Sequence, residues 1–236
     1  MFGFYIDKWY IILVIPAMIF MLITQIIVKS AMSRYADVKN SRGLTGRDIA
    51  EQILHANGIF DVRIERLAKG DGDHYDPKAK AIRLSAQVYD SPSVSSVGIA
   101  AHEAGHAVQH SVGYSPLVIR NTVIPITQFV SWLPVPMLII SVLLASRAVV
   151  ASEFLFKAAF IILFAGLFVQ LITLPVEFNA SRRAMQAIRE HNALAGAELT
   201  GARKVLTAAA MTYVAAFFVS LMNILRLLLI FGRRNN

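Results

Sequence analysis

The sequence contains no cysteine, and only 16% of its 236 residues are charged. Without cysteine there can be neither a disulfide framework nor a thiolate metal site, so a bound metal would need histidine, carboxylate or water ligands. The low charge content accompanies 56% hydrophobic residues and a mean hydropathy of +0.56. This composition is too apolar for an ordinary soluble domain and indicates a protein solvated largely by a lipid bilayer.

Acidic residues are also scarce. The sequence has 15 Asp and Glu but 23 Lys and Arg, which gives a formal net charge of +8. A basic excess is typical of proteins that bind nucleic acid or anionic lipid, and of membrane proteins with positive cytoplasmic loops. Outside the membrane flanks the basic residues do not interleave with aromatic side chains, which argues against nucleic acid as a partner.

Four apolar runs are long enough to cross a bilayer core of about 30 Å as helices. They cover residues 9–28, 123–145, 156–176 and 208–230. Met1-Phe2-Gly3-Phe4 has no basic n-region and no Ala-x-Ala pattern follows the first run, so we expect a retained anchor, with signal cleavage as the alternative. Arg226 lies inside the last run and is expected to snorkel or to face protein.

The basic loops predict the topology. Lys and Arg cluster after the first run and again in segment 177–207, as the positive-inside rule expects of cytoplasmic segments. Counting crossings from an outside N-terminus then places 32–116 and 177–207 in the cytoplasm. Arg233 and Arg234 would fall outside, so the last run either overrides the charge rule or is re-entrant or interfacial.

The polar segment 32–116 predicts a small α+β domain. Thr45 begins a short amphipathic helix as its N-cap, and Asn57-Gly58 ends it. Alternating residues at 62–67 and 81–84 on either side of a glycine-rich turn predict a hairpin. A second helix begins at Ser91-Pro92-Ser93 and continues to Gly113.

We therefore predict a mainly α, polytopic membrane protein with about four transmembrane helices and a small α+β domain that contains a short hairpin. The predicted organisation is an N-terminal anchor, the small domain, two transmembrane helices, a helical segment, and a C-terminal transmembrane helix with its tail, at residues 1–31, 32–116, 117–176, 177–207 and 208–236.

The second predicted helix carries His102-Glu103-Ala104-Gly105-His106, which has the form H-E-x-x-H. A spacing of four residues stacks the two imidazoles on one helix face, so both can bind one ion. Glu103 is rotated by about 100° from His102 and can reach a water at that ion without being a ligand. The motif predicts a zinc peptidase in which Glu103 takes the proton of the attacking water.

Two histidines leave zinc short of ligands, since catalytic sites usually have three protein ligands and a water. The metzincin continuation is absent, because Gln109 and Val112 stand where that pattern has glycine and histidine. Glu153 falls on the opposite predicted side of the bilayer from His102, and Glu190 and Glu198 lie in polar surroundings typical of solvated faces. Glu177 directly follows an apolar run, on the same predicted side as His102. We therefore predict Glu177 as the third ligand, and an ordinary interfacial carboxylate is the alternative.

These segments resemble the bacterial membrane-bound neutral zinc metallopeptidases of the YugP-like family and, more distantly, the HtpX and CAAX-prenyl-type membrane gluzincins. The resemblance covers nearly the whole chain and rests on Leu44-Thr45-Gly46, Asp73-His74-Tyr75-Asp76-Pro77, Arg83-Leu84-Ser85, Ala100 to Ala107, and Glu177-Phe178-Asn179-Ala180-Ser181-Arg182-Arg183-Ala184.

The resemblance implies a zincin-like domain and a gluzincin-type endopeptidase in the bacterial inner (plasma) membrane, with its active site on the cytoplasmic side. One catalytic Zn²⁺ would be held by His102, His106 and Glu177, with Glu103 as general base. The expected partners are the lipid bilayer and protein or peptide substrates, membrane proteins among them. The sequence gives no indication of the oligomeric state.

Ser181 stands where the HtpX-like pattern has an acid, so another side chain is expected to support the zinc histidines. The candidates for this support or for stabilising the oxyanion are His74, Asn179, Ser181, Arg182 and His191. His110, one turn beyond His106, is a weaker candidate. The non-catalytic alternative is a structural zinc closed by a fourth protein ligand, His110 or His191.

Overall fold

The computed structural model describes residues 7–68 and 72–232. The chain divides into two compact units. The helical unit comprises Met1–Ile23, Ile119–Leu174 and Tyr213–Asn236, and the mixed unit comprises Thr24–Val118 and Pro175–Thr212. The Arg233 and Arg234 positions lie outside the described residues.

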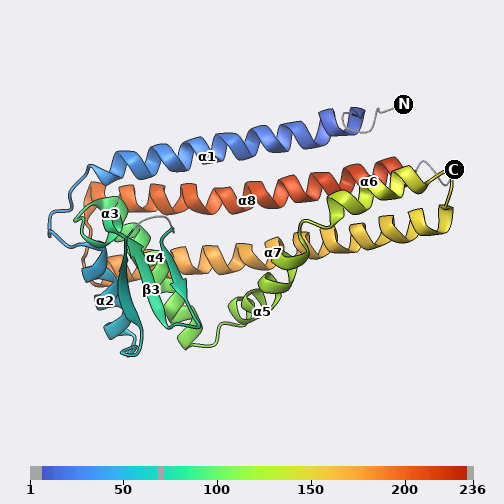
Figure 1. The fold of residues 1–236 in the computed structure, drawn as a ribbon. Helices are drawn as coiled ribbons and strands as arrows, with labels where there is room; N and C mark the ends of the chain where they lie inside the picture. The colour runs from blue at the N-terminus through green and yellow to red at the C-terminus, as the bar shows by residue number, and fades with distance from the viewer. Residues whose placement is uncertain (1–6, 69–71, 233–236) are drawn as a thin grey trace. The chain divides into compact units, whose positions relative to one another are not determined.

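Three long helices are apolar enough to cross a membrane (Figure 1). They are the π-helical turn η1 (Tyr10–Val14) continued by α1 (Ile15–Ala36), α7 (Val149–Glu190), and α8 (Gly196–Gly232). A fourth candidate is the bent pair of α5 (Ser115–Val130) and α6 (Pro134–Leu144). The described residues thus contain three to four candidate spans, which confirms the predicted polytopic α-helical membrane protein.

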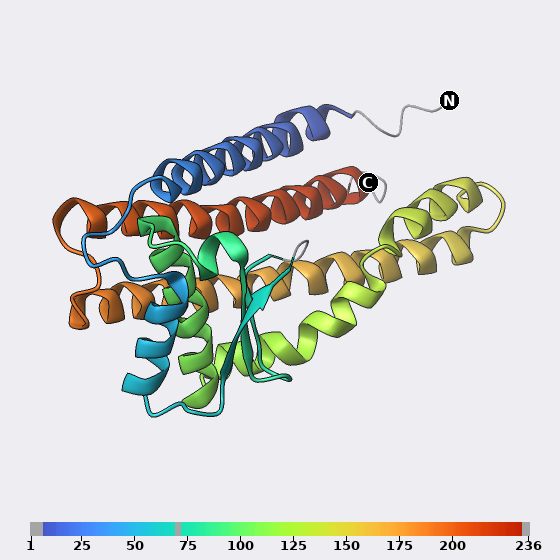
Figure 2. The same cartoon turned by 60° about the vertical axis from the view of Figure 1, so that its left-hand side comes forward.

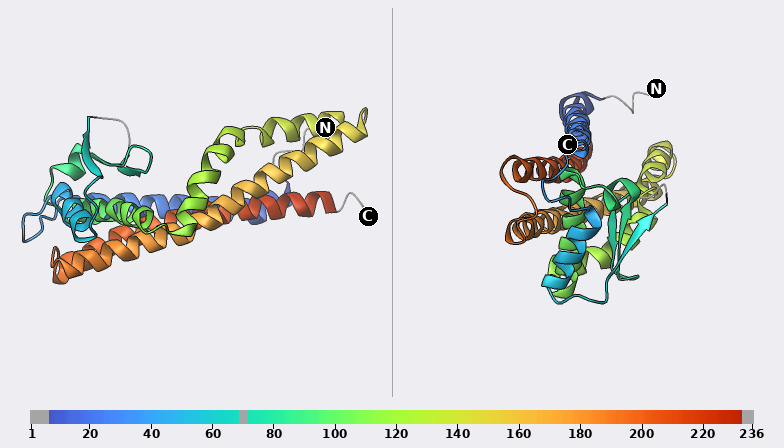
Figure 3. Two further views of the ribbon diagram at one scale, coloured as in Figure 1. Left: turned by 90° about the horizontal axis from the view of Figure 1, so that it is seen from below. Right: turned by 90° about the vertical axis from the view of Figure 1, so that its left-hand side faces the viewer.

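The expected run 123–145 is two helices that meet at 45° (Figure 3). Residues 131–133 form a turn, and Pro134 occupies the first position of α6. Proline suits that position because its missing N–H would have no intrahelical acceptor, but it cannot continue a preceding helix. Ser141 and Ser152 join α6 to α7, since each hydroxyl donates to the other residue's carbonyl, at 2.8 and 2.6 Å.

Arg226 on α8 faces protein within the helical unit. Its Nε donates to Asp7 Oδ2 at 2.7 Å, its Nη2 lies 2.6 Å from the same oxygen, and its guanidinium stacks over the ring of Tyr10 at 5.0 Å. Only 15% of the Arg226 side chain is exposed. A charge inside an apolar run is costly unless it is paired, so the carboxylate explains how this arginine is tolerated.

The mixed unit contains a three-stranded sheet with helices packed on it (Figure 2). Its further elements are α2 (Gly46–Ala56), β1 (Arg63–Leu67), β2 (His74–Asp76), β3 (Ala81–Ser85), α3 (Ala86–Tyr89) and α4 (Val94–Ser111). The strand order is β1-β3-β2. Both predicted helix starts are confirmed: Thr45 and Asp48 form a capping box, and Ser93 accepts the N–H of Ser96 at the start of α4.

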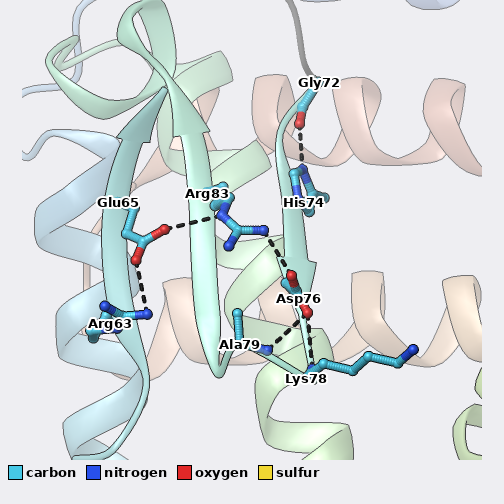
Figure 4. A network of polar contacts seen from close by, with 8 residues as sticks. All are labelled: Arg63, Glu65, Gly72, His74, Asp76, Lys78, Ala79 and Arg83. Atoms are coloured by element: carbon cyan, nitrogen blue, oxygen red, sulfur yellow. Dashed lines mark hydrogen bonds and ion pairs between the residues drawn. The ribbon is translucent and has the colours of Figure 1, made fainter. Parts of the chain in front are cut away.

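The small domain contains a hairpin, as predicted, but between other strands than expected. β2 pairs antiparallel with β3, whereas β1 pairs parallel with β3. The predicted hairpin between 62–67 and 81–84 is therefore wrong. The sequence did not reveal β2, because a strand of three residues is too short to show an alternating pattern. Arg83 of β3 ties the three strands together through Glu65 of β1 at 3.0 Å and Asp76 of β2 at 2.7 Å (Figure 4).

Helix α4 runs through the core of the mixed unit and approaches its neighbours closely. A Cβ added at Gly105 would lie 2.8 Å from the carbonyl oxygen of Ala180 on α7. A Cβ added at Gly98 would meet nothing nearer than Ala202 Cβ, at 3.7 Å. Glycine is therefore required at position 105 and not at position 98.

Gly105→Ala is expected to lower the free energy of unfolding by about 1–3 kcal/mol, because the new methyl group forces α4 away from the backbone of α7. Gly98→Ala should be neutral or stabilising by up to about 1 kcal/mol, since alanine has the better helix propensity. Thermal unfolding of the two full-length variants in detergent tests this. Equal melting temperatures for the two variants would contradict the required contact at position 105.

Candidate metal centre

Two helices of the mixed unit bring together three side chains that could hold a metal ion. The candidate ligand atoms of His102, His106 and Glu177 all lie within 4.8 Å of one another. The Nε2 atom of His102 is 3.2 Å from Glu177 Oε2, and that of His106 is 3.6 Å from the same oxygen. Glu177 is 2% exposed, and His106 is 8% exposed. The carboxylate of Glu177 on α7 thus lies beside the histidine pair of α4.

The local sequence explains this convergence. Residues 177, 180, 181 and 184 follow an i, i+3, i+4, i+7 pattern, so they form one face of α7. Ala180 and Ala184 are small and fully buried, and Gly105 of α4 lies against Ala180. The small residues let the two helix backbones come close enough for Glu177 to reach both imidazoles.

The donor set fits zinc. Two atoms about 2.0–2.1 Å from one tetrahedral ion lie about 3.3 Å apart, which is close to the 3.2 and 3.6 Å found between the Nε2 atoms and Glu177 Oε2. The ring nitrogens that face away from this cluster also have partners. His102 Nδ1 lies 3.2 Å from Ser181 Oγ, and His106 Nδ1 lies 2.9 Å from Gln109 Oε1. Such outer contacts are usual for zinc-binding histidines.

Glu103 lies on α4 between the two histidines and is 8% exposed. Burial raises the pKa of its carboxyl to about 7, and the negative charges of Glu177 and Asp73 act in the same direction. The charge of His102 and a hydrogen bond from the backbone N–H of Tyr75 oppose this rise in pKa. The Glu103 carboxyl thus has an acidity suited to accepting and returning a proton near neutral pH.

Tyr75 of β2 also contacts α4 through its side chain. Its hydroxyl lies 2.7 Å from His110 Nδ1, and burial raises the pKa of Tyr75 to about 12. His110 therefore contacts the strand and does not belong to the three-residue cluster of the described residues.

The structure brings together some of the predicted supporting residues. Ser181 contacts His102, and Asn179 Oδ1 accepts a hydrogen bond from Gln109 Nε2 at 3.0 Å. Sequence reasoning missed Gln109 as a contact of His106. The available signal was a polar residue three positions after His106 on a helix whose buried positions are otherwise mostly small or apolar.

Three other candidates have different surroundings. His74 donates from Nδ1 to the carbonyl of Gly72 at 2.7 Å (Figure 4). Arg182 is exposed on α7, about 140° around the helix from Glu177, where it lines a groove with Arg189 and Arg203. His191 directly follows the end of α7, about 20 Å along the helix axis from Glu177.

The apolar helices and the histidine–carboxylate cluster define a membrane protein with a candidate metal centre. Residues 10–232 match the model of a family described as "Putative neutral zinc metallopeptidase". The chain is 42% identical over 230 residues to a Bacillus subtilis (strain 168) protein named "Putative membrane protease YugP", covering 96% of this chain and 99% of the relative. No solved structure matches the chain. The chain therefore belongs to this neutral zinc metallopeptidase family, which confirms the resemblance seen in the sequence.

Zinc should stabilise the purified protein through the three-residue cluster. At a free zinc concentration 100 times the dissociation constant, binding raises the free energy of unfolding by about 2.7 kcal/mol. This corresponds to a rise in melting temperature on the order of 5–10 °C. Glu177→Gln should lose most of this rise, because an amide replaces the charged ligand. Glu190→Gln, an exposed change on the same helix, is the control and should keep it. An equal zinc response in both variants would exclude Glu177 as a ligand.

Proposed function

We propose that the protein is a membrane-integrated zinc-dependent endopeptidase of the gluzincin type, with one catalytic Zn²⁺ held by His102, His106 and Glu177. The observation that carries this proposal is the convergence of three donor atoms within 4.8 Å, beside the buried carboxyl of Glu103. Membership of the zinc metallopeptidase family supports the choice of metal and of reaction.

When bound, Zn²⁺ supplies Lewis acidity that polarises the scissile carbonyl and makes a water more acidic. The carboxylate of Glu103 removes a proton from the water while the water oxygen forms a bond to the carbonyl carbon. The same carboxyl then delivers that proton to the peptide nitrogen, and the carbon–nitrogen bond breaks. A pKa near 7 suits both steps, because the group must accept the proton and give it back.

The edge of the small sheet is the proposed binding place for an extended substrate. β2 is an outer strand in the order β1-β3-β2, and the backbone N–H of Tyr75 reaches Glu103. An extended peptide can add to an exposed strand edge through backbone hydrogen bonds. A peptide that pairs with β2 would lie next to the general base, so we propose unfolded or membrane-protein segments as substrates.

The contacts of the remaining histidines favour a catalytic over a structural metal. A structural zinc is normally closed by four protein ligands. His110, one candidate for a fourth ligand, contacts Tyr75, and the other, His191, follows the far end of α7. Three protein ligands leave a coordination position for substrate or water, as a peptidase requires.

Glu103→Gln should lower kcat/KM for peptide hydrolysis by about 10²–10⁴-fold, because the amide cannot accept the proton. Zinc content, measured by metal analysis of the purified protein, should stay at the wild-type level, because Glu103 is not among the three proposed ligands. Glu51→Gln on the surface of α2 is the matched control and should retain full activity. Wild-type hydrolysis rates in the Glu103 variant would refute the proposed mechanism.

We also propose that the protein lies in the bacterial inner membrane with segments 32–116 and 177–207 in the cytoplasm. The segment boundaries predicted from the sequence are kept in this proposal: an anchor at 1–31, the zincin-like domain at 32–116, two transmembrane helices in 117–176, the third-ligand segment at 177–207 and the last transmembrane helix at 208–236. The clusters of Lys and Arg on the two proposed cytoplasmic segments support this orientation.

Because the sequence contains no cysteine, a single introduced cysteine can be labelled specifically to test this orientation. Phe60 is 76% exposed in the small domain, and Val150 is 84% exposed at the start of α7. A membrane-impermeant maleimide should label Val150→Cys in intact spheroplasts, whereas Phe60→Cys should react only after the membrane is opened. The reverse labelling pattern would invert the proposed topology.

A further inference from the structure

Gln109 is a buried polar side chain at the end of the metal centre, on the same helix as both histidines. It has no exposed surface. Its Oε1 lies 2.9 Å from His106 Nδ1, and its Nε2 donates to the carbonyl of Val176 at 2.8 Å and to Asn179 Oδ1 at 3.0 Å. The side chain therefore joins a proposed ligand on α4 to the backbone of the residue that precedes Glu177 on α7.

The neighbours of Gln109 leave one orientation for its amide. The carbonyl of Val176 can only accept a hydrogen bond. Asn179 Oδ1 already accepts from Nε of Arg183 at 2.9 Å, and a guanidinium can only donate, so this end of Asn179 is also an acceptor. Both acceptors require the NH₂ end of Gln109. Its oxygen must then face His106.

This orientation determines the protonation of the imidazole. Because Gln109 Oε1 is an acceptor, His106 Nδ1 must carry the proton. In a neutral imidazole the other nitrogen then has a lone pair. That nitrogen, His106 Nε2, is the atom that lies 3.6 Å from Glu177 Oε2.

We propose that Gln109 is a positioning residue that holds His106 in the Nδ1–H form and aims its Nε2 lone pair at the metal. This inference rests on the proposed function, because it takes His106 to be a zinc ligand. Only a group with one acceptor and two donors satisfies the three surrounding partners. A carboxylate would satisfy His106 but would place an oxygen against Val176 O and Asn179 Oδ1.

Two variants separate the contribution of the Gln109 acceptor from that of its two donors. Gln109→Met preserves the length of the side chain but removes every hydrogen bond, and it should weaken zinc binding by about 10–100-fold, as is usual for the loss of an outer partner of a ligand histidine. Gln109→Glu keeps an acceptor for His106 but loses both donors, so it should fail to restore the wild-type zinc affinity. Gln170→Met is the control, since Gln170 donates to Ser220 in the helical unit.

The experiment measures the zinc dissociation constant of each full-length protein in detergent by competition with a chelator, together with the visible spectrum of its Co²⁺ form and the melting temperature without metal. We expect weaker zinc binding and an altered cobalt spectrum in both Gln109 variants, and wild-type values in Gln170→Met. A purely structural role for Gln109 would lower only the metal-free melting temperature.

The outcomes distinguish this inference from the proposed function. If the wild-type protein does not bind zinc, the proposed function fails. If the wild type binds zinc and Gln109→Met binds it equally tightly with the same cobalt spectrum, the positioning role fails while the peptidase proposal stands. Wild-type or tighter zinc binding by Gln109→Glu would show that the two donors are not required.

Discussion

The close approach of α4 to α7 is the contact on which the candidate metal centre depends. His102 and His106 are fixed relative to each other by one helical turn, but Glu177 comes from a helix that begins after two further elements of the chain. The three side chains can meet only because Gly105 presents no Cβ to the carbonyl of Ala180. The glycine inside the H-E-x-x-H segment therefore has a packing role that its two histidines require.

The polar partners of the two histidine Nδ1 atoms, which face away from Glu177, are uncharged. Ser181 supplies a hydroxyl to His102, and Gln109 supplies an amide to His106. Zinc-binding histidines are often supported by carboxylates, which make the imidazole a stronger donor. With neutral partners at both Nδ1 atoms, a bound cation would retain more of its positive charge for polarising a substrate.

Local patterns in the sequence predicted much of this arrangement. The caps at Thr45 and Ser93 and the histidine pair depend on short spacings, which a single helix dictates. Glu177 was predictable because the loop charges limit which carboxylates share a side of the bilayer. The hydrogen bonds from Gln109 to Val176 and Asn179 were not predictable, because they depend on the rotation of α7 that brings these two residues to α4.

The sequence did not predict the parallel strand pairing or the bend between α5 and α6, for related reasons. A parallel partner for β1 cannot be read from alternation, since periodicity shows only that a segment is extended and not what lies beside it. A run of apolar residues likewise gives the length of a span and not its straightness, and the turn before Pro134 interrupts it.

The Asp7–Arg226 ion pair has a consequence for how the chain threads the bilayer. Asp7 precedes the first candidate span, and Arg226 lies in the last turns of the final one, yet their charged groups touch. The outer ends of the first and last spans are therefore at the same level. A polypeptide whose two ends share a face of the membrane passes through it an even number of times. The four candidate spans would give such an even number, with the bent α5–α6 pair as the fourth span.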